Sequence, residues 1–192
     1  MESTGHPSTR RRELQLGRKP SFTETELLET TKKLILEHGY DGFHFKLLSR
    51  HLPGARSTIY QYFSNKEELV AACMKRVIAK VLEQTSNIDE QDAIVALQKL
   101  LLIYAQEAEL HQLLGDVHKV KTDNVKALDD LAFVEQAHSL LKAQLSRLIE
   151  RAQKEGKLRE DIPSPVLLGT FFNLIDTPNL MNVHTEQWGN LL

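Results

Sequence analysis

Hydrogen-bond donors and aromatic rings gather in the stretch ARSTIYQYFSNKEEL, which covers residues 55–69. Arg56, Ser57 and Thr58 stand near its start, and three aromatic residues follow them. A helix made only for burial would not carry such a polar start. The chemistry that these side chains offer is hydrogen bonding to an anion or to a polar edge, because a guanidinium and two hydroxyls present their N–H and O–H groups in one place.

Bond-making chemistry has no comparable pattern in this sequence. There is no Ser/His/Asp or paired-carboxylate arrangement and no glycine-rich phosphate loop. His111 and His118 are seven residues apart and could share a helical face, but no third ligand is spaced for a metal. We therefore expect no catalytic residue, no metal site and no cofactor.

Two short helical segments surround the polar stretch. The pattern predicts one over about residues 45–51 and another over about 56–62, separated by the breaker pair Pro53 and Gly54. Neither segment is long enough to be stable alone, so both must pack on neighbours. Two short helices joined by a tight turn, with a polar start to the second, are typical of a helix-turn-helix, here at about residues 44–63.

Longer helices are predicted on both sides of this pair. Thr23 and Glu26 have the spacing of a capping box that begins a helix over roughly 24–38, and Gly39 ends it. Further helices are expected from a capping box at Ser64 and Glu67 to about Leu82, from a cap at Asp89 through 92–114, over about 125–155 up to Gly156, and from Ser164 and Pro165 onward. No strand pattern competes, so the sequence predicts an all-α protein.

Charge is distributed unevenly along the chain, whose formal net charge is -2. Residues 1–80 carry 14 Lys and Arg against 9 Asp and Glu, whereas residues 81–192 carry 10 against 17. A basic front half suggests a polyanionic partner, and an acidic back half suggests another task. Residues 1–20 are polar and include three consecutive arginines, so we expect a flexible basic arm, which could follow a phosphate backbone or be an unstructured tail.

The compartment is indicated by two absences in the sequence. Cys73 is the single cysteine, so no internal disulfide can form and a reducing compartment fits. No run approaches the roughly 18 apolar residues of a membrane span, and residues 1–20 lack the apolar core of a signal peptide. We expect a cytoplasmic protein that does not contact a membrane.

The order of these elements resembles the DNA-binding domain of the tetracycline-repressor (TetR) family of transcriptional regulators. The likeness covers about Thr23 to Val81. Its most specific part is STIYQYFSNKEEL, which matches the family's small-Thr-apolar-Tyr-x-x-Phe-x-x-Lys-Glu-x-Leu run. After the arm at 1–20, the resemblance implies a helix-turn-helix DNA-binding domain at 21–82 and a helical bundle for ligand binding and dimerisation at 83–192.

Roles for the opening stretch follow from this likeness. The second helix of a helix-turn-helix lies in the major groove with its first residues toward base edges, so Arg56, Ser57 and Thr58 are expected to read bases. The resemblance implies that Tyr60 and Lys66 hold phosphates, with packing and a solvated charge as their alternatives. The other expected DNA contacts are His44, Lys46, Gln61 and Tyr62, with Arg50 as a further backbone candidate.

The turn departs from the family's pattern. Members usually carry Gly, an apolar residue and Ser where this chain has Pro53, Gly54 and Ala55, and His44 stands where Thr is usual. Proline cannot adopt a left-handed turn conformation, whereas Gly54 can. The register of the reading helix is therefore open by about one residue.

The resemblance also implies tasks for the second half, because members of the family are homodimers whose C-terminal domain binds a small molecule. Two reading helices must lie about 34 Å apart to enter successive major grooves. Broad apolar faces predict a four-helix interface with the symmetry mate, the alternative being burial within one subunit, at Leu141, Leu145, Leu148, Phe171, Phe172 and Ile175. The side chains expected to line a ligand pocket are Tyr104, His111, Phe133 and His138, with Trp188 as a further aromatic wall.

These patterns together predict a DNA-binding transcriptional regulator. By the family's default it is a ligand-responsive repressor that binds a palindromic operator in double-stranded DNA as a homodimer and is released by an unknown small-molecule effector. One alternative is a helical enzyme or scaffold whose N-terminus only imitates a helix-turn-helix. Another is a non-specific DNA-binding protein, which the acidic second half disfavours.

Overall fold

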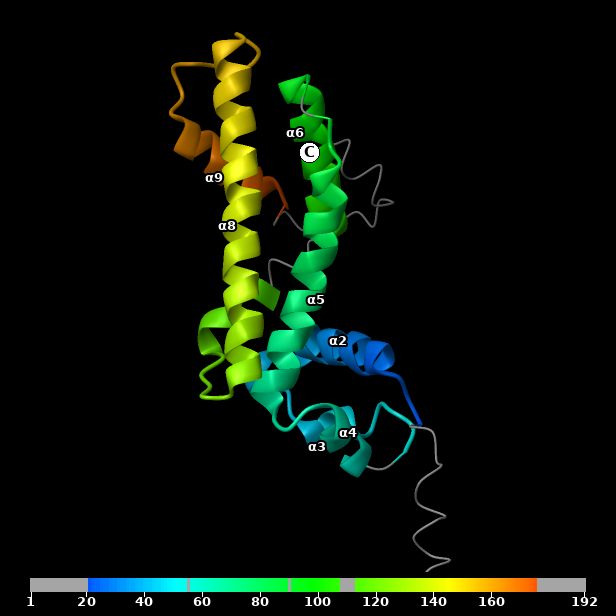
Figure 1. Cartoon of the computed structure of the whole chain (residues 1–192). Helices are drawn as coiled ribbons and strands as arrows, with labels where there is room; N and C mark the ends of the chain where they lie inside the picture. Colours follow the sequence, from blue (N-terminus) through cyan, green and yellow to red (C-terminus); the bar gives the residue numbers. More distant parts are fainter. Residues whose placement is uncertain (1–20, 55, 90, 108–112, 176–192) are drawn as a thin grey trace, which may run out of the picture.

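Helices are the only long regular elements in the residues that the computed structural model describes, 21–54, 56–89, 91–107 and 113–175. This architecture agrees with the all-α prediction (Figure 1). In chain order the elements are α2 (Glu24–Gly42), α3 (Phe45–Leu48), α4 (Arg56–Tyr62), α5 (Lys66–Ser86), α6 (Ala93–Gln106), the short 3-10 helix η1 (Val117–Lys119), α8 (Val125–Lys154) and α9 (Ser164–Ile175).

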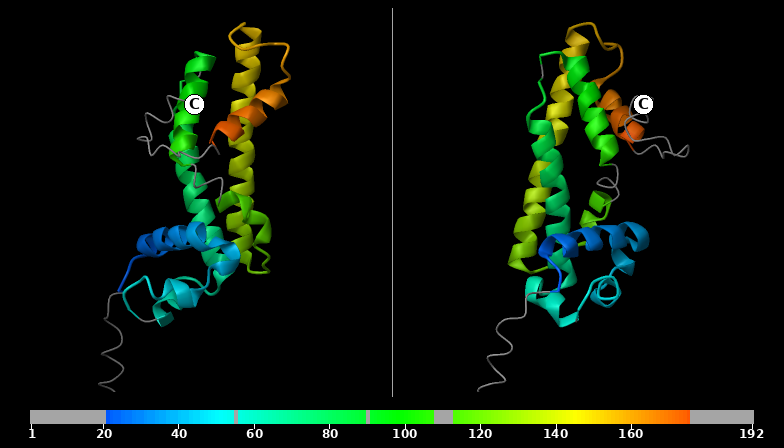
Figure 2. Two further views of the ribbon diagram at one scale, coloured as in Figure 1. Left: turned by 180° about the vertical axis from the view of Figure 1, so that it is seen from behind. Right: turned by 90° about the vertical axis from the view of Figure 1, so that its right-hand side faces the viewer.

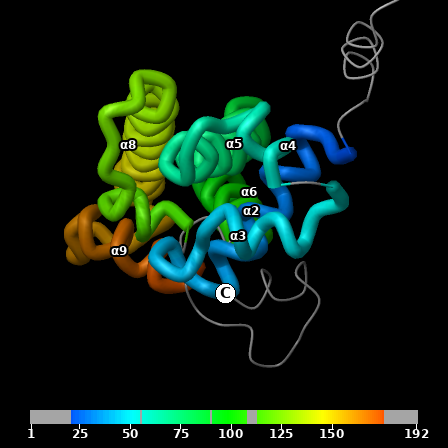
Figure 3. The backbone as a smooth tube through the Cα atoms, turned by 90° about the horizontal axis from the view of Figure 1, so that it is seen from below, coloured from blue at the N-terminus to red at the C-terminus, as the bar shows by residue number. Residues whose placement is uncertain are grey.

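Two long helices form the frame of the molecule. Helices α5 and α8 run side by side along much of their length, and α6 and α9 pack against the upper part of α8 (Figures 1 and 2). Helix α2 crosses the lower end of α5, and α3 and α4 lie below it, at the end of the molecule that Figure 3 views from underneath. The short helices are therefore presented at one tip.

One hydrophobic core runs through both parts of the molecule. Its buried side chains extend from Phe22 near the first helix to Ile175 at the end of α9. Helix α5 contributes to both parts, since it packs on α2 at its lower end and along α8 above. Because α5 has neighbours in both parts, a shift of this helix would be felt by both. None of the helices in the described residues is long and apolar enough to cross a membrane.

The start of α2 and two glycine stops confirm the local predictions. The N–H of Glu26 donates to Thr23 Oγ1 at 3.2 Å, and the N–H of Thr23 donates to Glu26 Oε2 at 2.7 Å, which is the expected capping box. Gly39 and Gly156 adopt left-handed φ angles of 71° and 68°, which glycine accepts most easily. At Gly39 the backbone leaves the helical conformation, so the first run of α2 stops there as predicted, and a further helical turn continues to Gly42.

Three predicted caps were misplaced by one to three residues. Helix α5 is capped by Asn65, whose side chain accepts from Glu68 N–H, and α6 is capped by Asp92 instead of Asp89. Ser64 binds Glu68 rather than forming a box with Glu67, since its N–H and hydroxyl both donate to Glu68 Oε2. Ser164 lies inside α9, and its hydroxyl donates to Gln153. Helix α5 also runs past the predicted end at Leu82, to Ser86.

Candidate nucleic-acid interface and ligand cavity

The turn before α4 depends on a glycine. Gly54 has a φ of 102°, so it takes the left-handed conformation that Pro53 cannot. A Cβ built on Gly54 would lie 2.0 Å from Ser21 Oγ, while the Ser21 hydroxyl donates to the carbonyl of Pro53 at 2.6 Å. The turn is thus held against the start of the described chain. Ala55, the third residue of the predicted turn, lies outside the described residues.

His44 caps the start of α3, as the family likeness implied for this position. His44 Nδ1 accepts a hydrogen bond from Leu47 N–H at 2.9 Å, which caps the helix. The ring is exposed, so its other nitrogen can donate outward. Phe45 and Leu48 are buried beneath it, and Lys46 is exposed on the solvent side. The cap therefore also offers a donor at the tip of the molecule.

Helix α4 has a buried side and an exposed polar side. Ile59 is buried, and Phe63, which follows the helix, is also buried, so these two apolar residues hold α4 on the core. Arg56, Ser57 and Gln61 are exposed, and Thr58 is partly exposed. The segment from 42 to 66 contains four Lys or Arg residues and no Asp or Glu. The exposed side of α4 thus offers donors in a basic surrounding, which suits a polyanion.

Arg56 and Tyr60 form a single unit on this surface. Arg56 Nη2 donates to the Tyr60 hydroxyl at 3.1 Å, and the guanidinium carbon lies 5.7 Å from the centre of the Tyr60 ring. The Tyr60 ring also meets Phe45 edge to face, with centroids 5.1 Å apart. Tyr60 remains 49% exposed, so its hydroxyl can still reach a partner in solvent. Packing and exposure thus coexist at Tyr60, and its expected contact with a phosphate stays a prediction.

Two of the expected DNA contacts turn toward the protein. The Tyr62 hydroxyl donates to the carbonyl of Phe22 at 2.9 Å, and its ring lies 5.8 Å from the ring of Phe22. Lys66 Nζ donates to the carbonyl of Tyr40 at 2.6 Å and lies 4.0 Å from the centre of that ring. Burial lowers the pKa of Lys66. Both side chains therefore tie α4 and α5 to α2, and their expected contacts with DNA stay predictions.

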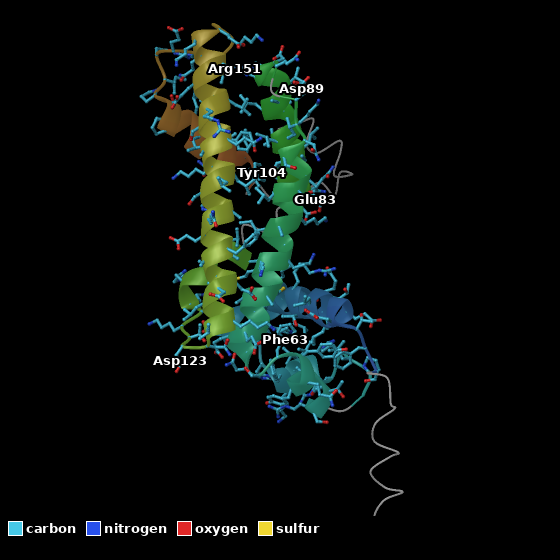
Figure 4. The ribbon with its side chains drawn as sticks, viewed as in Figure 1. Phe63, Glu83, Asp89, Tyr104, Asp123 and Arg151 are labelled. Atoms are coloured by element: carbon cyan, nitrogen blue, oxygen red, sulfur yellow. The ribbon has the colours of Figure 1, made fainter. Side chains whose placement is uncertain are left out.

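A cavity lies between the long helices of the upper part. It has a volume of about 250 Å³ and is lined by residues of α5, α6, α8 and α9 together with Leu114 and Gly115. Tyr104 and His138, two of the expected pocket residues, line it, and so does Phe172, which the sequence placed in the dimer interface. Figure 4 shows Tyr104 in the upper bundle, at the level where α9 passes α8.

The other expected pocket residues lie elsewhere. Phe133 is half-buried and Lys75 Nζ lies 5.5 Å from the centre of its ring, away from the side chains that line the cavity. His111 and Trp188 are outside the described residues. Sequence reasoning missed Lys142, which lines the cavity one turn after His138, although this i, i+4 spacing on α8 could have pointed to it.

The side chains predicted for the dimer interface are mostly buried within the single chain. Five of the six predicted residues are buried within the single chain, which is the alternative that the sequence left open, and Phe172 is half-buried; the five are Leu141, Leu145, Leu148, Phe171 and Ile175. A side chain that is already covered by its own chain cannot contribute new buried area to a partner. The large apolar side chains that α8 and α9 do expose are Val125, Leu128, Leu140 and Val166.

In the part of the chain that the structure describes, no three His, Cys, Asp or Glu side chains come close enough together to hold a metal ion. Cys73 is buried, and burial raises the pKa of its thiol to about 12, so the thiol stays protonated and unreactive.

Comparison with known proteins identifies relatives of both parts. Residues 27–73 match a family described as "Bacterial regulatory proteins, tetR family". The transcriptional repressor AcnR of Corynebacterium glutamicum is 26% identical over 155 residues, which cover 79% of this chain and 77% of AcnR.

Solved structures share the fold across nearly the whole chain. The ketosteroid regulator KstR2 of Mycobacterium tuberculosis has a TM-score of 0.73 at 13% identity, with 91% of this chain and 94% of that chain covered. AibR, solved in complex with isovaleryl coenzyme A and operator DNA, has a TM-score of 0.68 at 17% identity, with 87% and 94% covered. At these identities the likeness shows a common fold.

Proposed function

Because the chain belongs to the tetR family of bacterial regulatory proteins, we propose that it is a DNA-binding transcriptional repressor whose hold on its operator is controlled by a small molecule. The relatives it matches are regulators rather than enzymes, and we assign the chain no catalytic role. Its working form is a homodimer in the cytoplasm. Residues 21–82 form the DNA-binding domain and residues 83–192 the ligand-binding and dimerisation domain, and the basic residues 1–20 add an arm.

One observation carries the DNA-binding part of this proposal. Helix α4 exposes Arg56, Ser57 and Gln61 to solvent at the tip of the molecule. The segment 42–66, which includes α3 and α4, contains no Asp or Glu. In a helix-turn-helix this exposed side enters the major groove, where an Arg can form two hydrogen bonds with guanine. His44 and Tyr60 lie beside it as phosphate contacts, with Lys46 as a third.

Dimerisation is required by the spacing of the grooves. One copy of α4 reads one half-site, and a second copy must lie about 34 Å away along the duplex. Helices α8 and α9 supply the contact through the side that they leave exposed, which includes Leu140 and Val166. A symmetric pair places both α4 tips on the same side, and a palindromic operator matches that symmetry.

A polar connection links the cavity to the DNA-binding tip. Leu114 and Gly115 line the cavity, and the next residue, Asp116, accepts a hydrogen bond from the N–H of Tyr40 at 3.2 Å. A hydrogen bond from Lys119 lowers the pKa of Asp116, so its carboxylate is charged. The carbonyl of Tyr40 in turn holds Lys66 in the first turn of α5. A ligand that displaces residues 114–115 therefore pulls on Tyr40 and on the junction after α4.

Selection from a randomised duplex library tests the DNA-binding proposal. The full chain should enrich a two-fold symmetric sequence, because two identical tips read two half-sites. Arg56→Ala should relax the preference at one base pair of each half-site by about 1–3 kcal/mol. Lys154→Ala, at an exposed position at the far end of α8, is the matched control and should enrich the wild-type sequence. Equal retention of all sequences by the wild type would contradict the proposal.

A further inference from the structure

The cavity between the long helices has a mainly apolar wall. Ile78 of α5, Leu141 of α8 and Phe172 of α9 face it, together with Leu114. These side chains can accept an apolar body of small size, since the volume is about 250 Å³. A strongly hydrated molecule would lose its hydrogen bonds to water there, and this apolar wall would not replace them.

Among the described residues that line the cavity, Tyr104 is the buried polar side chain. It is 3% exposed, and its ring meets Phe171 edge to face with centroids 6.0 Å apart. Among the described residues its hydroxyl has no hydrogen-bond partner. Burial raises the pKa of Tyr104, so the hydroxyl keeps its proton and remains a donor. Tyr104 lines the cavity, so a ligand bound there could supply an acceptor for this hydroxyl.

The mouth of the cavity carries positive charge. His138 and Lys142 stand one turn apart on α8, are both exposed, and both line the cavity. Lys142 has no carboxylate partner among the described residues, and no Asp or Glu belongs to the cavity wall that they form. A negative group at this mouth would be attracted, and a cationic ligand would be repelled.

From these three observations we propose that the cavity binds a small acyl compound. Its apolar body packs on Ile78, Leu141 and Phe172, its acyl oxygen accepts the hydrogen bond of Tyr104, and its negative charge faces Lys142 and His138. This assignment deepens the proposed function, on which it rests, by naming the class of the effector. Two sources share this chemistry: a free carboxylic acid, and an acyl thioester whose phosphates carry the charge.

Other ligand classes leave at least one of these groups without a partner. A neutral hydrocarbon would fill the apolar wall but leave the Tyr104 hydroxyl unpaired. A nucleotide would match the charge but place polar atoms against Ile78 and Phe172. An acyl anion satisfies the wall, the donor and the charge at once.

Calorimetric titration of the full chain tests the proposal with three matched probes: octanoate, octanoyl-coenzyme A and uncharged octanamide. At least one of the two anions should bind about tenfold more tightly than octanamide, because only the anions pair with Lys142. Whichever anion binds more tightly identifies the source of the acyl group. Failure of both anions to bind would overturn the proposal.

Two variants separate the roles of the donor and the charge. Tyr104→Phe keeps the ring against Phe171 and should weaken the better anion and octanamide alike, by about tenfold. Lys142→Gln should weaken the anion and leave octanamide unchanged, whereas Lys154→Gln, on the same helix but outside the cavity, should alter neither. Wild-type affinity in Tyr104→Phe would refute the role of the hydroxyl. Lys142 is exposed, so its variant should fold and give a result even if Tyr104→Phe does not.

The same protein distinguishes this proposal from the function on which it rests. If the chain selects a symmetric duplex but binds none of the three probes, the acyl assignment is wrong and the DNA-binding function stands. If the anions bind with the predicted dependence on Tyr104 and Lys142 but no duplex is selected, the cavity assignment stands and the DNA-binding function is wrong.

Discussion

At the lower tip of the molecule α4 turns Arg56, Ser57 and Gln61 toward solvent over a sealed core, whereas in the upper bundle Tyr104 holds a single hydroxyl inside an apolar wall (Figure 4). The first arrangement suits a large, strongly charged surface that remains in water. The second suits a small molecule that leaves water. One fold can therefore present polar groups outward for a polymer and inward for an effector, with α5 and the Asp116–Tyr40 contact between the two regions.

The largest effect should come from removing the support under the exposed tip. Phe63 is 2% exposed, and Lys126 Nζ lies 5.2 Å from the centre of its ring. Phe63→Ala should lower the free energy of unfolding by about 3–5 kcal/mol, because it leaves a cavity at the junction of α4, α5 and α8. Urea denaturation measures this loss. Val166→Ala, at an exposed site, should change it by no more than about 0.5 kcal/mol. A loss below about 1 kcal/mol for Phe63→Ala would show that the tip is not anchored there.

The next effect concerns the donors themselves. Arg56→Ala should reduce discrimination between bases by about 1–3 kcal/mol, and Tyr60→Phe should weaken all duplexes by about 0.5–1.5 kcal/mol. Because the Tyr60 hydroxyl accepts from Arg56, the two changes should not add. A double-mutant cycle of duplex affinities measures this coupling. Strict additivity would mean that each residue contacts DNA independently.

A smaller effect should appear in acid. Burial raises the pKa of Glu68, but hydrogen bonds from the hydroxyl and N–H of Ser64 and from Lys126 outweigh it, so the pKa lies below its ordinary value. A carboxyl group whose pKa is lowered on folding stabilises the folded state at pH values above its ordinary pKa near 4.5. This stabilisation is lost as the pH falls through the pKa of the folded state.

Glu68→Gln should therefore lower the free energy of unfolding by about 1.5 kcal/mol at neutral pH and make the loss of stability in acid shallower. Urea denaturation at a series of pH values gives the comparison. Glu67→Gln is the neighbouring control and should keep the wild-type slope. If the free energy of unfolding of Glu68→Gln fell in acid as steeply as that of the wild type, Glu68 would not stabilise the contact between α5 and α8.

The smallest effect should fall on the connection between the two regions. Asp116→Ala removes the acceptor of the Tyr40 N–H at the residue that follows Gly115 of the cavity wall. Affinity for duplex without effector should stay near the wild-type value. The change in duplex affinity caused by the effector should shrink by about 0.5–1 kcal/mol. Duplex titrations with and without a saturating effector measure this coupling. If the effector changed the duplex affinity of Asp116→Ala as much as that of the wild type, the Asp116–Tyr40 contact would not carry the coupling.

Local signals explain which parts of the fold could be predicted from the sequence. The capping box at Thr23 and the glycine stops depend on residues a few positions apart, so they are visible in the chain. Caps were misplaced where short polar residues are neighbours, as at Ser64 and Asn65, because either can accept from a helix N–H and only the path of the chain decides.

Contacts that are distant in sequence explain the rest. The apolar stripe with Leu141 and Leu145 predicts burial but does not say whether the same chain or a partner covers it. Lys66 donates to the carbonyl of Tyr40, 26 residues earlier in the chain, and no sequence spacing predicts that contact. The position of the Tyr104 side chain at the cavity is equally hard to predict from the sequence, since it depends on four helices that meet around one cavity.

Footprinting of the selected duplex tests the central claim most directly, namely that paired α4 helices read successive major grooves. Methylation interference at guanine N7 should reveal two symmetric clusters in the major groove, about 34 Å apart and on one face of the duplex, and Arg56→Ala should remove one guanine from each cluster. A single cluster, interference confined to the minor groove, or a pattern that Arg56→Ala leaves intact would contradict it.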